Sequence, residues 1–173
     1  MKRNEKEEII RNILMPDEKM IYEHYDDFSI SYIGGHVPWG TKAMINLFLT
    51  NQRVIIFMPT FFGGPPARGP FSIFYKDISS VSIITQDKLT ATRVILLGIL
   101  SPLWKKKKPL LVIEMKNDIG EISPICLDFS WTKDQKDGWS GKVKWGLDSW
   151  HQNISLQRYN YLQSQASENR PLG

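Results

Sequence analysis

The chain has 173 residues, of which 42% are hydrophobic and 23% are charged. This length corresponds to one domain, and this composition is typical of a folded protein rather than a disordered one. The single cysteine, Cys126, excludes an intramolecular disulfide framework and agrees with a reducing, cytoplasmic compartment. The charged start of the chain is unlike a signal peptide. The most apolar stretch, Val94–Leu100, is far shorter than the roughly 20 residues of a membrane-spanning helix.

Positive charge is concentrated in one stretch of the sequence. The chain carries a net charge of +4, yet residues 88–116 alone carry +6, so the remainder is slightly acidic. A local basic patch of this kind favours an anionic partner: a phospholipid surface, a nucleic acid or an acidic protein.

The first third of the chain changes from a helical to a strand pattern. Apolar residues at helical spacing, from Ile9 to Leu14, predict a short amphipathic helix that Pro16 ends. Alternation around Ile30 then predicts a strand, with a weaker one over residues 20–25. Gly34 and Gly35 predict the loop that follows.

The clearest hairpin spans residues 45–58. Ile45, Leu47 and Leu49 alternate on one side, and Val54, Ile56 and Met58 alternate on the other. Asn51 and Gln52 lie between these runs and predict a tight two-residue turn, because asparagine tolerates a positive φ.

The middle of the chain predicts two loops among further strands. Pro59–Pro70 is rich in glycine and proline and predicts a long loop. The residues after it, 71–75 and 78–84, predict strands. Residues 92–100 predict a buried strand, with a short helix as the alternative, and Ser101–Pro109 predicts a basic loop. Alternation over 111–116 and 125–131 predicts two more strands.

The last part of the chain returns to helical spacing. Residues 132–142 predict a polar linker, and an apolar stripe over residues 143–163 predicts a helix about 30 Å long. The expected domain organisation is a helical segment over 1–15, one domain over 16–163 and a tail over 164–173. Seven to nine consecutive strands without intervening helices predict a mainly β fold with a C-terminal α-helix. We expect an antiparallel barrel or sandwich that this helix caps.

Three sequence motifs in the same order resemble those of the GRAM and bacterial pleckstrin-homology-like domains. They are Leu14–Lys19, which resembles the Leu-x-Pro-Gly-Glu opening, Leu49–Phe57, which resembles the Leu-Thr-Asn-x-Arg strand, and Tyr75–Val81, which resembles the Asp-Ile-x-x-Val strand. Asp17 stands where the family has glycine. The resemblance implies a seven-stranded pleckstrin-homology-like barrel capped by a helix. It also implies a binding or scaffolding module and no enzyme. The stretch Glu23–Asp27 is acidic where phosphoinositide-binding members carry basic residues.

The strongest candidate site is the basic loop. Trp104 precedes four lysines, Lys105, Lys106, Lys107 and Lys108. Each lysine near an anionic bilayer contributes about 1 kcal/mol, and tryptophan is favoured at the headgroup level. The alternative reading is a solvated loop that keeps a hairpin soluble.

A second candidate is a partner-binding loop that carries Phe61, Phe62 and Arg68. The alternative is that the two phenylalanines fold back over the edge of the barrel. Arg53 is expected to have a structural role, pairing with a carboxylate or capping carbonyls. Trp145 and Trp150 are expected to pack the helix against the barrel.

The sequence offers little chemistry for catalysis. The three histidines, His24, His36 and His151, are not at metal-ligand spacing with one another or with Cys126. Cys126 fits a small buried apolar residue better than a nucleophile. We therefore expect no enzyme activity, no metal and no cofactor.

These observations favour a non-enzymatic binding module that associates peripherally with anionic lipid at the inner membrane face. The alternative is a protein-interaction domain without lipid binding, including self-association into a homo-oligomer. Nucleic acid ranks lowest, because single-strand binders align positive charge along a groove rather than at one loop.

Overall fold

The computed structural model describes residues 3–24, 30–35, 43–58, 68–84, 109–116, 120–129, 135–136 and 143–168. Its helices are α1 (Arg3–Ile13) and α3 (Leu147–Glu168), with a 3-10 turn η1 (Tyr75–Asp77). Its strands are β1 (Met20–His24), β2 (Ile30–Gly35), β3 (Ala43–Thr50), β4 (Arg53–Met58), β5 (Arg68–Phe74), β6 (Ile78–Ile84), β7 (Leu110–Lys116), β8 (Ile122–Asp128), β9 (Gln135–Lys136) and β10 (Val143–Lys144).

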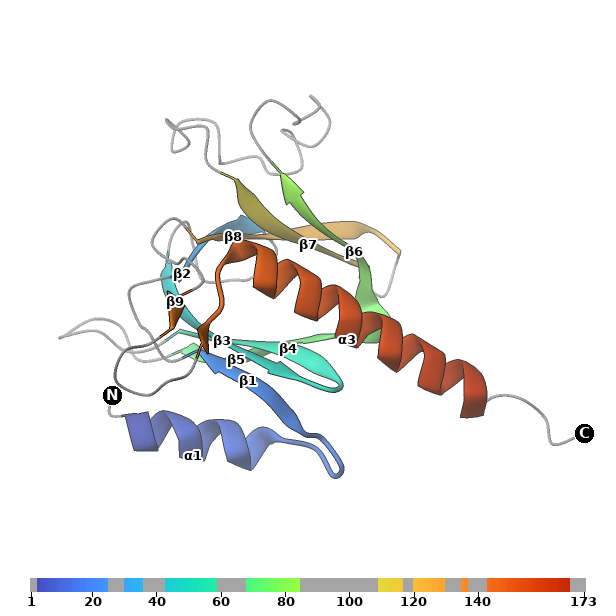
Figure 1. Ribbon diagram of the computed structural model, residues 1–173, viewed down its shortest axis with the longest axis horizontal. Coiled ribbons are helices and arrows are strands. Elements are labelled where there is room, and N and C mark those ends of the chain that lie inside the picture. Colours follow the sequence, from blue (N-terminus) through green and yellow to red (C-terminus); the bar gives the residue numbers. More distant parts are fainter. Residues whose placement is uncertain are drawn as a thin grey trace, which may run out of the picture.

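One antiparallel path, β5-β4-β3-β2-β8-β7-β6, runs through the fold. Strand β3 changes partner along its length: Leu47 pairs with His24 of β1, whereas Ile45 pairs with Ile30 of β2. The path therefore bends at β3 into a first sheet (β1, β3, β4, β5) and a second sheet (β2, β8, β7, β6), which Figure 1 shows as two layers.

The sheets enclose the main core and leave one corner open. Strands β5 and β6 follow each other through η1 but lie at opposite ends of the path and do not pair. Helix α3 covers this corner, and Trp150 and Ile154 are fully buried in the main core. The predicted fold class is therefore confirmed: the protein is mainly β, with antiparallel sheets and a C-terminal capping helix. The sheets form a sandwich rather than a closed barrel.

A second, smaller core lies on the outer face of the first sheet. Ile10 of α1 packs there against Phe48, Ile55 and Phe57. Helix α1 therefore lies below this sheet in Figure 1. Because the main core covers the inner face and α1 covers the outer face, nearly every residue of β4 is buried.

Several predicted elements are present with the expected bounds. The hairpin of β3 and β4 has Asn51 and Gln52 as its two-residue turn, with Leu49 opposite Val54. Strand β6 spans residues 78–84, as predicted. Helix α1 ends at Ile13, before Pro16.

Other expectations were wrong. Asn51 does not have a positive φ; among the described non-glycine residues only Asp17 does. Gly34 and Gly35 belong to β2 instead of a loop, and they pair with β8 across a register shift. Strand β5 begins at Arg68, inside the predicted Pro59–Pro70 loop.

The expected limits of the C-terminal elements also need correction. The predicted linker contains β9, which pairs with β10, so α3 begins at Leu147 rather than at residue 143. The helix continues to Glu168, beyond the predicted end at 163. Strand β8 begins at Ile122 and ends at Asp128, earlier than the predicted 125–131. The strand predicted over residues 92–100 lies outside the described residues.

Candidate functional site

The basic loop belongs to a long insertion between β6 and β7. Trp104 and the four lysines lie outside the described residues, but both anchors of the insertion lie inside them. Ile84, the last residue of β6, pairs with Leu110, the first residue of β7. Residues 85–109 therefore leave and rejoin the second sheet at one point.

The second candidate loop is anchored on the first sheet. Phe61 and Phe62 lie outside the described residues, whereas Arg68 is the first residue of β5 and pairs with Met58 at the end of β4. The two candidate loops thus leave from opposite ends of the strand path. Their anchors do not bring them into one site.

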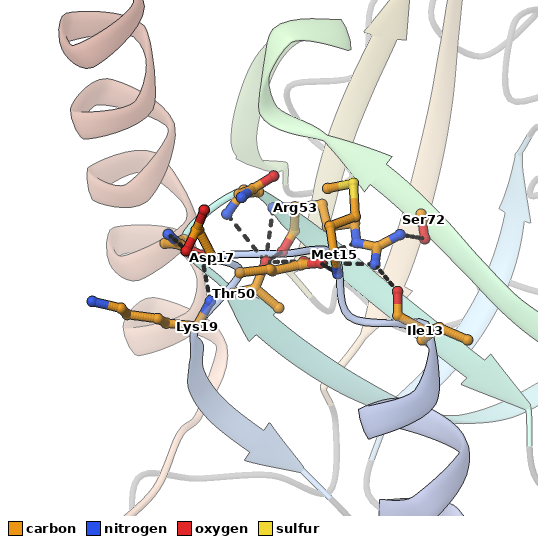
Figure 2. A network of polar contacts seen from close by, with 10 residues as sticks. Ile13, Met15, Asp17, Lys19, Thr50, Arg53 and Ser72 are labelled. Atoms are coloured by element: carbon orange, nitrogen blue, oxygen red, sulfur yellow. Dashed lines mark hydrogen bonds and ion pairs between the residues drawn. The ribbon is translucent and has the colours of Figure 1, made fainter.

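The best-defined polar cluster surrounds the buried ion pair of Glu18 and Arg53 (Figure 2). Arg53 donates from Nε to Oε1 of Glu18 at 2.8 Å and from Nη2 to Oε2 at 2.8 Å. The same guanidinium donates to the Ile13 carbonyl at the end of α1 and to Ser72 Oγ of β5. One side chain therefore ties α1, the segment after it and two strands together.

A tight turn presents Glu18 to this arginine. The Glu18 N–H donates to the Met15 carbonyl, closing a four-residue turn around Pro16 and Asp17. Proline at the second position and a residue with positive φ at the third are the type II pattern, and Asp17 has φ 64°. The GRAM opening motif that this segment resembles has glycine at this position, and the turn explains why a residue that tolerates positive φ is needed there.

The β3–β4 turn supplies the rest of the cluster. Thr50 Oγ1 donates to Glu18 and accepts the N–H groups of Gln52 and Arg53. Asn51 Oδ1 accepts the Lys19 N–H at 2.7 Å, so the asparagine joins the turn to the segment before β1. Asn51 therefore contributes through these hydrogen bonds, and not through the positive φ that the sequence suggested.

The environment shifts the pKa of two buried acids in opposite directions. Burial acts to raise the pKa of Glu18, but hydrogen bonds from Arg53, Met15 N–H and Thr50, together with the Arg53 charge, outweigh it and lower the pKa. Burial, aided by the charge of Glu18, raises the pKa of Tyr75 well above its usual range. The neutral Tyr75 hydroxyl donates to the Thr50 carbonyl at 2.6 Å. The cluster therefore combines the carboxylate of Glu18, the guanidinium of Arg53 and the neutral phenol of Tyr75. Its role is to hold the fold together.

An aromatic group holds the start of α3. Trp145 stacks on Tyr22 of β1 with ring centroids 3.8 Å apart, and Trp150 meets both rings edge-on. The expected packing role of Trp145 and Trp150 is confirmed. Arg158, further along α3, donates to the carbonyls of Ile78 and Ser79 and so also holds the helix against the start of β6.

Catalytic groups do not gather in the part of the chain that the structure describes. His151 Nε2 lies 3.3 Å from the Val81 carbonyl. Cys126 is fully buried, and burial, with the Glu114 charge, raises the pKa of its thiol to about 12. A thiol of this kind is a poor nucleophile. No set of three potential metal ligands occurs among the described residues, and none of the helices described is both long and apolar enough to cross a membrane.

The pairing of Glu18 with Arg53 was missed in the sequence. Both residues lie within the motifs that resemble the GRAM family, but the motifs are 35 residues apart. A buried position in alternation with apolar neighbours, such as that of Arg53, signals that an acidic partner is needed. The sequence gives no indication of which acid supplies it.

Comparisons with known proteins add one structural likeness. No family model matches the chain, and no curated protein matches it. Among solved structures, the chain is similar to the Vps36 N-terminal PH domain, with 16% sequence identity and a TM-score of 0.46. The match covers 87% of this chain and 86% of that one.

Proposed function

We propose that this protein is a non-enzymatic binding module of the GRAM or bacterial pleckstrin-homology-like family. In this proposal it associates with anionic membrane surfaces through Trp104 and Lys105–Lys108. The observation that carries it is the position of this segment within an insertion whose two anchors, Ile84 and Leu110, are paired residues of neighbouring strands. A basic segment anchored in this way can meet a membrane while the core of the domain stays intact.

The buried polar cluster supports the same assignment by exclusion. Its arginine is buried and uses four of its five N–H groups on Glu18, Ile13 and Ser72, so it is committed to the fold rather than to a phosphate. Point-charge attraction by lysines requires no shaped pocket, unlike bidentate recognition by arginine. We therefore propose recognition of surface charge rather than of one particular headgroup.

Liposome co-sedimentation tests this proposal. Vesicles with increasing phosphatidylserine content should bind the protein increasingly, and binding should weaken as salt is raised. The variant Lys105→Ala/Lys106→Ala should bind roughly 30-fold more weakly, because each lysine contributes about 1 kcal/mol.

The matched control is Lys19→Ala/Lys76→Ala, which removes the same charge from two exposed positions elsewhere. It should retain most of the binding. Equal losses in both variants would indicate that only net charge matters, and binding that ignores anionic lipid would disprove the proposal.

A protein partner is the second candidate, and α3 favours it. Leu156, Tyr159 and Leu162 are 51%, 60% and 40% exposed and lie from the middle of the helix onward. These side chains lie on one half of the helix surface and could pack against another chain. Light scattering of the wild type and of Leu156→Asp, at several concentrations, tests self-association through this face.

A further inference from the structure

The outer face of the second sheet is apolar near one end. Directly paired residues in an antiparallel sheet place their side chains on the same face. Leu111 and Leu127 are paired and lie in the main core, so the neighbouring pair, Val112 and Cys126, faces outward. The register puts three further residues on this outer face: Ser82, Ile84 and Leu110.

These outward residues are nevertheless buried. Leu110 is 1%, Val112 2% and Cys126 0% exposed, although none of them belongs to either core cluster of the described residues. The Ser82 hydroxyl is also buried and has no hydrogen-bond partner among the described residues. An apolar cover explains both facts, because it would exclude water without offering a polar group.

The burial changes along β7. Leu110 and Val112, next to the anchors of the insertion, are buried, whereas Glu114 is half-buried and Lys116 is exposed. The cover therefore extends from the end of the sheet where residues 85–109 leave and return. The first sheet has a comparable arrangement, since α1 covers its outer face.

We propose that the apolar stretch Val94–Leu100 packs across the outer face of β6, β7 and β8, over Val112 and Cys126. This contact within the chain does not depend on membrane association. It would make the insertion an integral part of the fold rather than a free loop. The basic segment that follows the stretch would then be held at a fixed edge of the sheet.

The dimensions and the chemistry agree with this occupant. Residues 85–93 can span up to about 30 Å when extended, more than enough to reach the middle strand. Three adjacent strands are about 10 Å wide, and seven residues are about 10 Å long as a helix and about 23 Å as a strand. Val94–Leu100 has no charged or polar side chain, which suits the apolar end of the face.

Two other segments outside the described residues adjoin the buried end of this sheet, and both fit the face less well; residues 36–42 and 117–119 adjoin the opposite end, beyond Gly35 and Lys116. Residues 25–29 include two aspartates, and residues 130–134 have Trp131 as their single large apolar residue. Neither supplies a continuous apolar surface.

The single cysteine is a built-in reporter of the cover. We would measure maleimide labelling of Cys126 in the intact chain at pH 7.5, relative to the same chain unfolded in urea. The wild type should label at least 100-fold more slowly than the unfolded chain. Ile95→Asp/Leu97→Asp should raise the native rate at least tenfold, because charged residues would detach the stretch from the sheet.

Three controls separate detachment from other effects. Thr92→Asp/Ser101→Asp adds the same charge beside the stretch and should leave the rate unchanged. Ile10→Ala weakens the packing of α1 on the first sheet. It should raise the labelling rate of Cys126 only by the amount expected from its lower free energy of global unfolding. Trp131→Ala tests the competing segment and should have no effect.

Cross-linking provides a second test that does not require the aspartate variant to fold. Under mild oxidation, at least one of Ile95→Cys, Leu96→Cys and Leu97→Cys should lose both thiols within the monomer, whereas Lys106→Cys should keep them. Three outcomes would overturn the proposal. They are unchanged labelling in the aspartate variant, protection of Cys126 that disappears on dilution, and a rate that rises only in Trp131→Ala.

Discussion

Replacing Arg53 with methionine tests whether the buried ion pair holds the N-terminal helix to the sheet. Glu18 and Arg53 are 8% and 6% exposed, so this pair differs from an exposed one, which is worth about 1 kcal/mol or less. In Arg53→Met, the Glu18 carboxylate would keep only Met15 N–H and Thr50 Oγ1 as donors. Leaving a buried charge without its counter-ion costs about 3–5 kcal/mol.

This loss should be visible in both chemical and thermal unfolding. For a chain of this size, 3–5 kcal/mol corresponds to a fall in Tm of about 6–20 °C. Urea titrations, followed by circular dichroism and by tryptophan fluorescence, would give the free energy of unfolding. Trp150 is fully buried in the main core, so unfolding of that core should contribute to the change in the summed emission of the six tryptophans.

A double-mutant cycle separates the pair from its surroundings. Glu18→Met alone should be similarly destabilising, because it leaves the guanidinium with only Ile13 O and Ser72 Oγ. Glu18→Met/Arg53→Met should lose less than the sum of the two single changes, because no buried charge remains unpaired. Strict additivity, or a loss below about 1 kcal/mol for Arg53→Met, would refute the reasoning.

Three further changes should follow from the same geometry. The pKa of Glu18 is lowered in the folded protein, so the stabilisation by its carboxylate is present above the unfolded value of 4.5 and is lost as the pH falls below it. In acid unfolding, the free energy of unfolding of Glu18→Gln should therefore depend less steeply on pH than that of the wild type. The pKa of Cys126 is raised to about 12, so the free energy of unfolding should fall as the pH rises above 9, by about 1.4 kcal/mol per pH unit. Urea titrations at pH 8–11 should show this fall in the wild type and not in Cys126→Ala. Asp17→Gly should raise stability by up to about 1 kcal/mol, because Asp17 has a positive φ, whereas Asp17→Ala should not; a lower Tm for the glycine variant would contradict the type II turn.

The sequence predicted those elements in which alternation alone decides the structure. The strands β3 and β4 have apolar residues at every second position facing the main core, and a period of two identifies such strands directly. The hairpin turn also follows from two polar residues between two such runs.

Strands that contain glycine or proline were harder to predict. Gly69 and Pro70 suggested a loop, but β5 is an edge strand, where proline costs no ladder hydrogen bond on its outer side. Gly34 and Gly35 continue β2 at a register shift opposite β8, a position that glycine suits. In both cases tertiary position overrides the local signal.

Local patterns did not identify the partners in the long-range polar contacts. Thr50, Asn51 and Arg53 suggested a turn and a structural arginine, and the structure confirms the turn and both expected roles of Arg53, as an ion-pair partner and as a donor to a carbonyl. The identity of Glu18 as the partner depends on how α1 meets the first sheet. Periodicity cannot show this, because it reports one element at a time.

The buried ion pair and the proposed binding segment are attached to different sheets, so we expect stability and binding to be affected by different substitutions. The Glu18–Arg53 pair secures α1 on the first sheet, whereas the basic segment is anchored on the second sheet, at the far end of the strand path. A variant such as Arg53→Met should therefore bind anionic vesicles like the wild type at temperatures well below its Tm. If it lost vesicle binding while still folded, the two sheets would have to communicate through β3, which pairs with both β1 and β2. Vesicle binding by this variant thus distinguishes two cases. In one, the domain is a rigid scaffold with an attached binding segment. In the other, a change at the first sheet alters binding by the segment that is anchored on the second sheet.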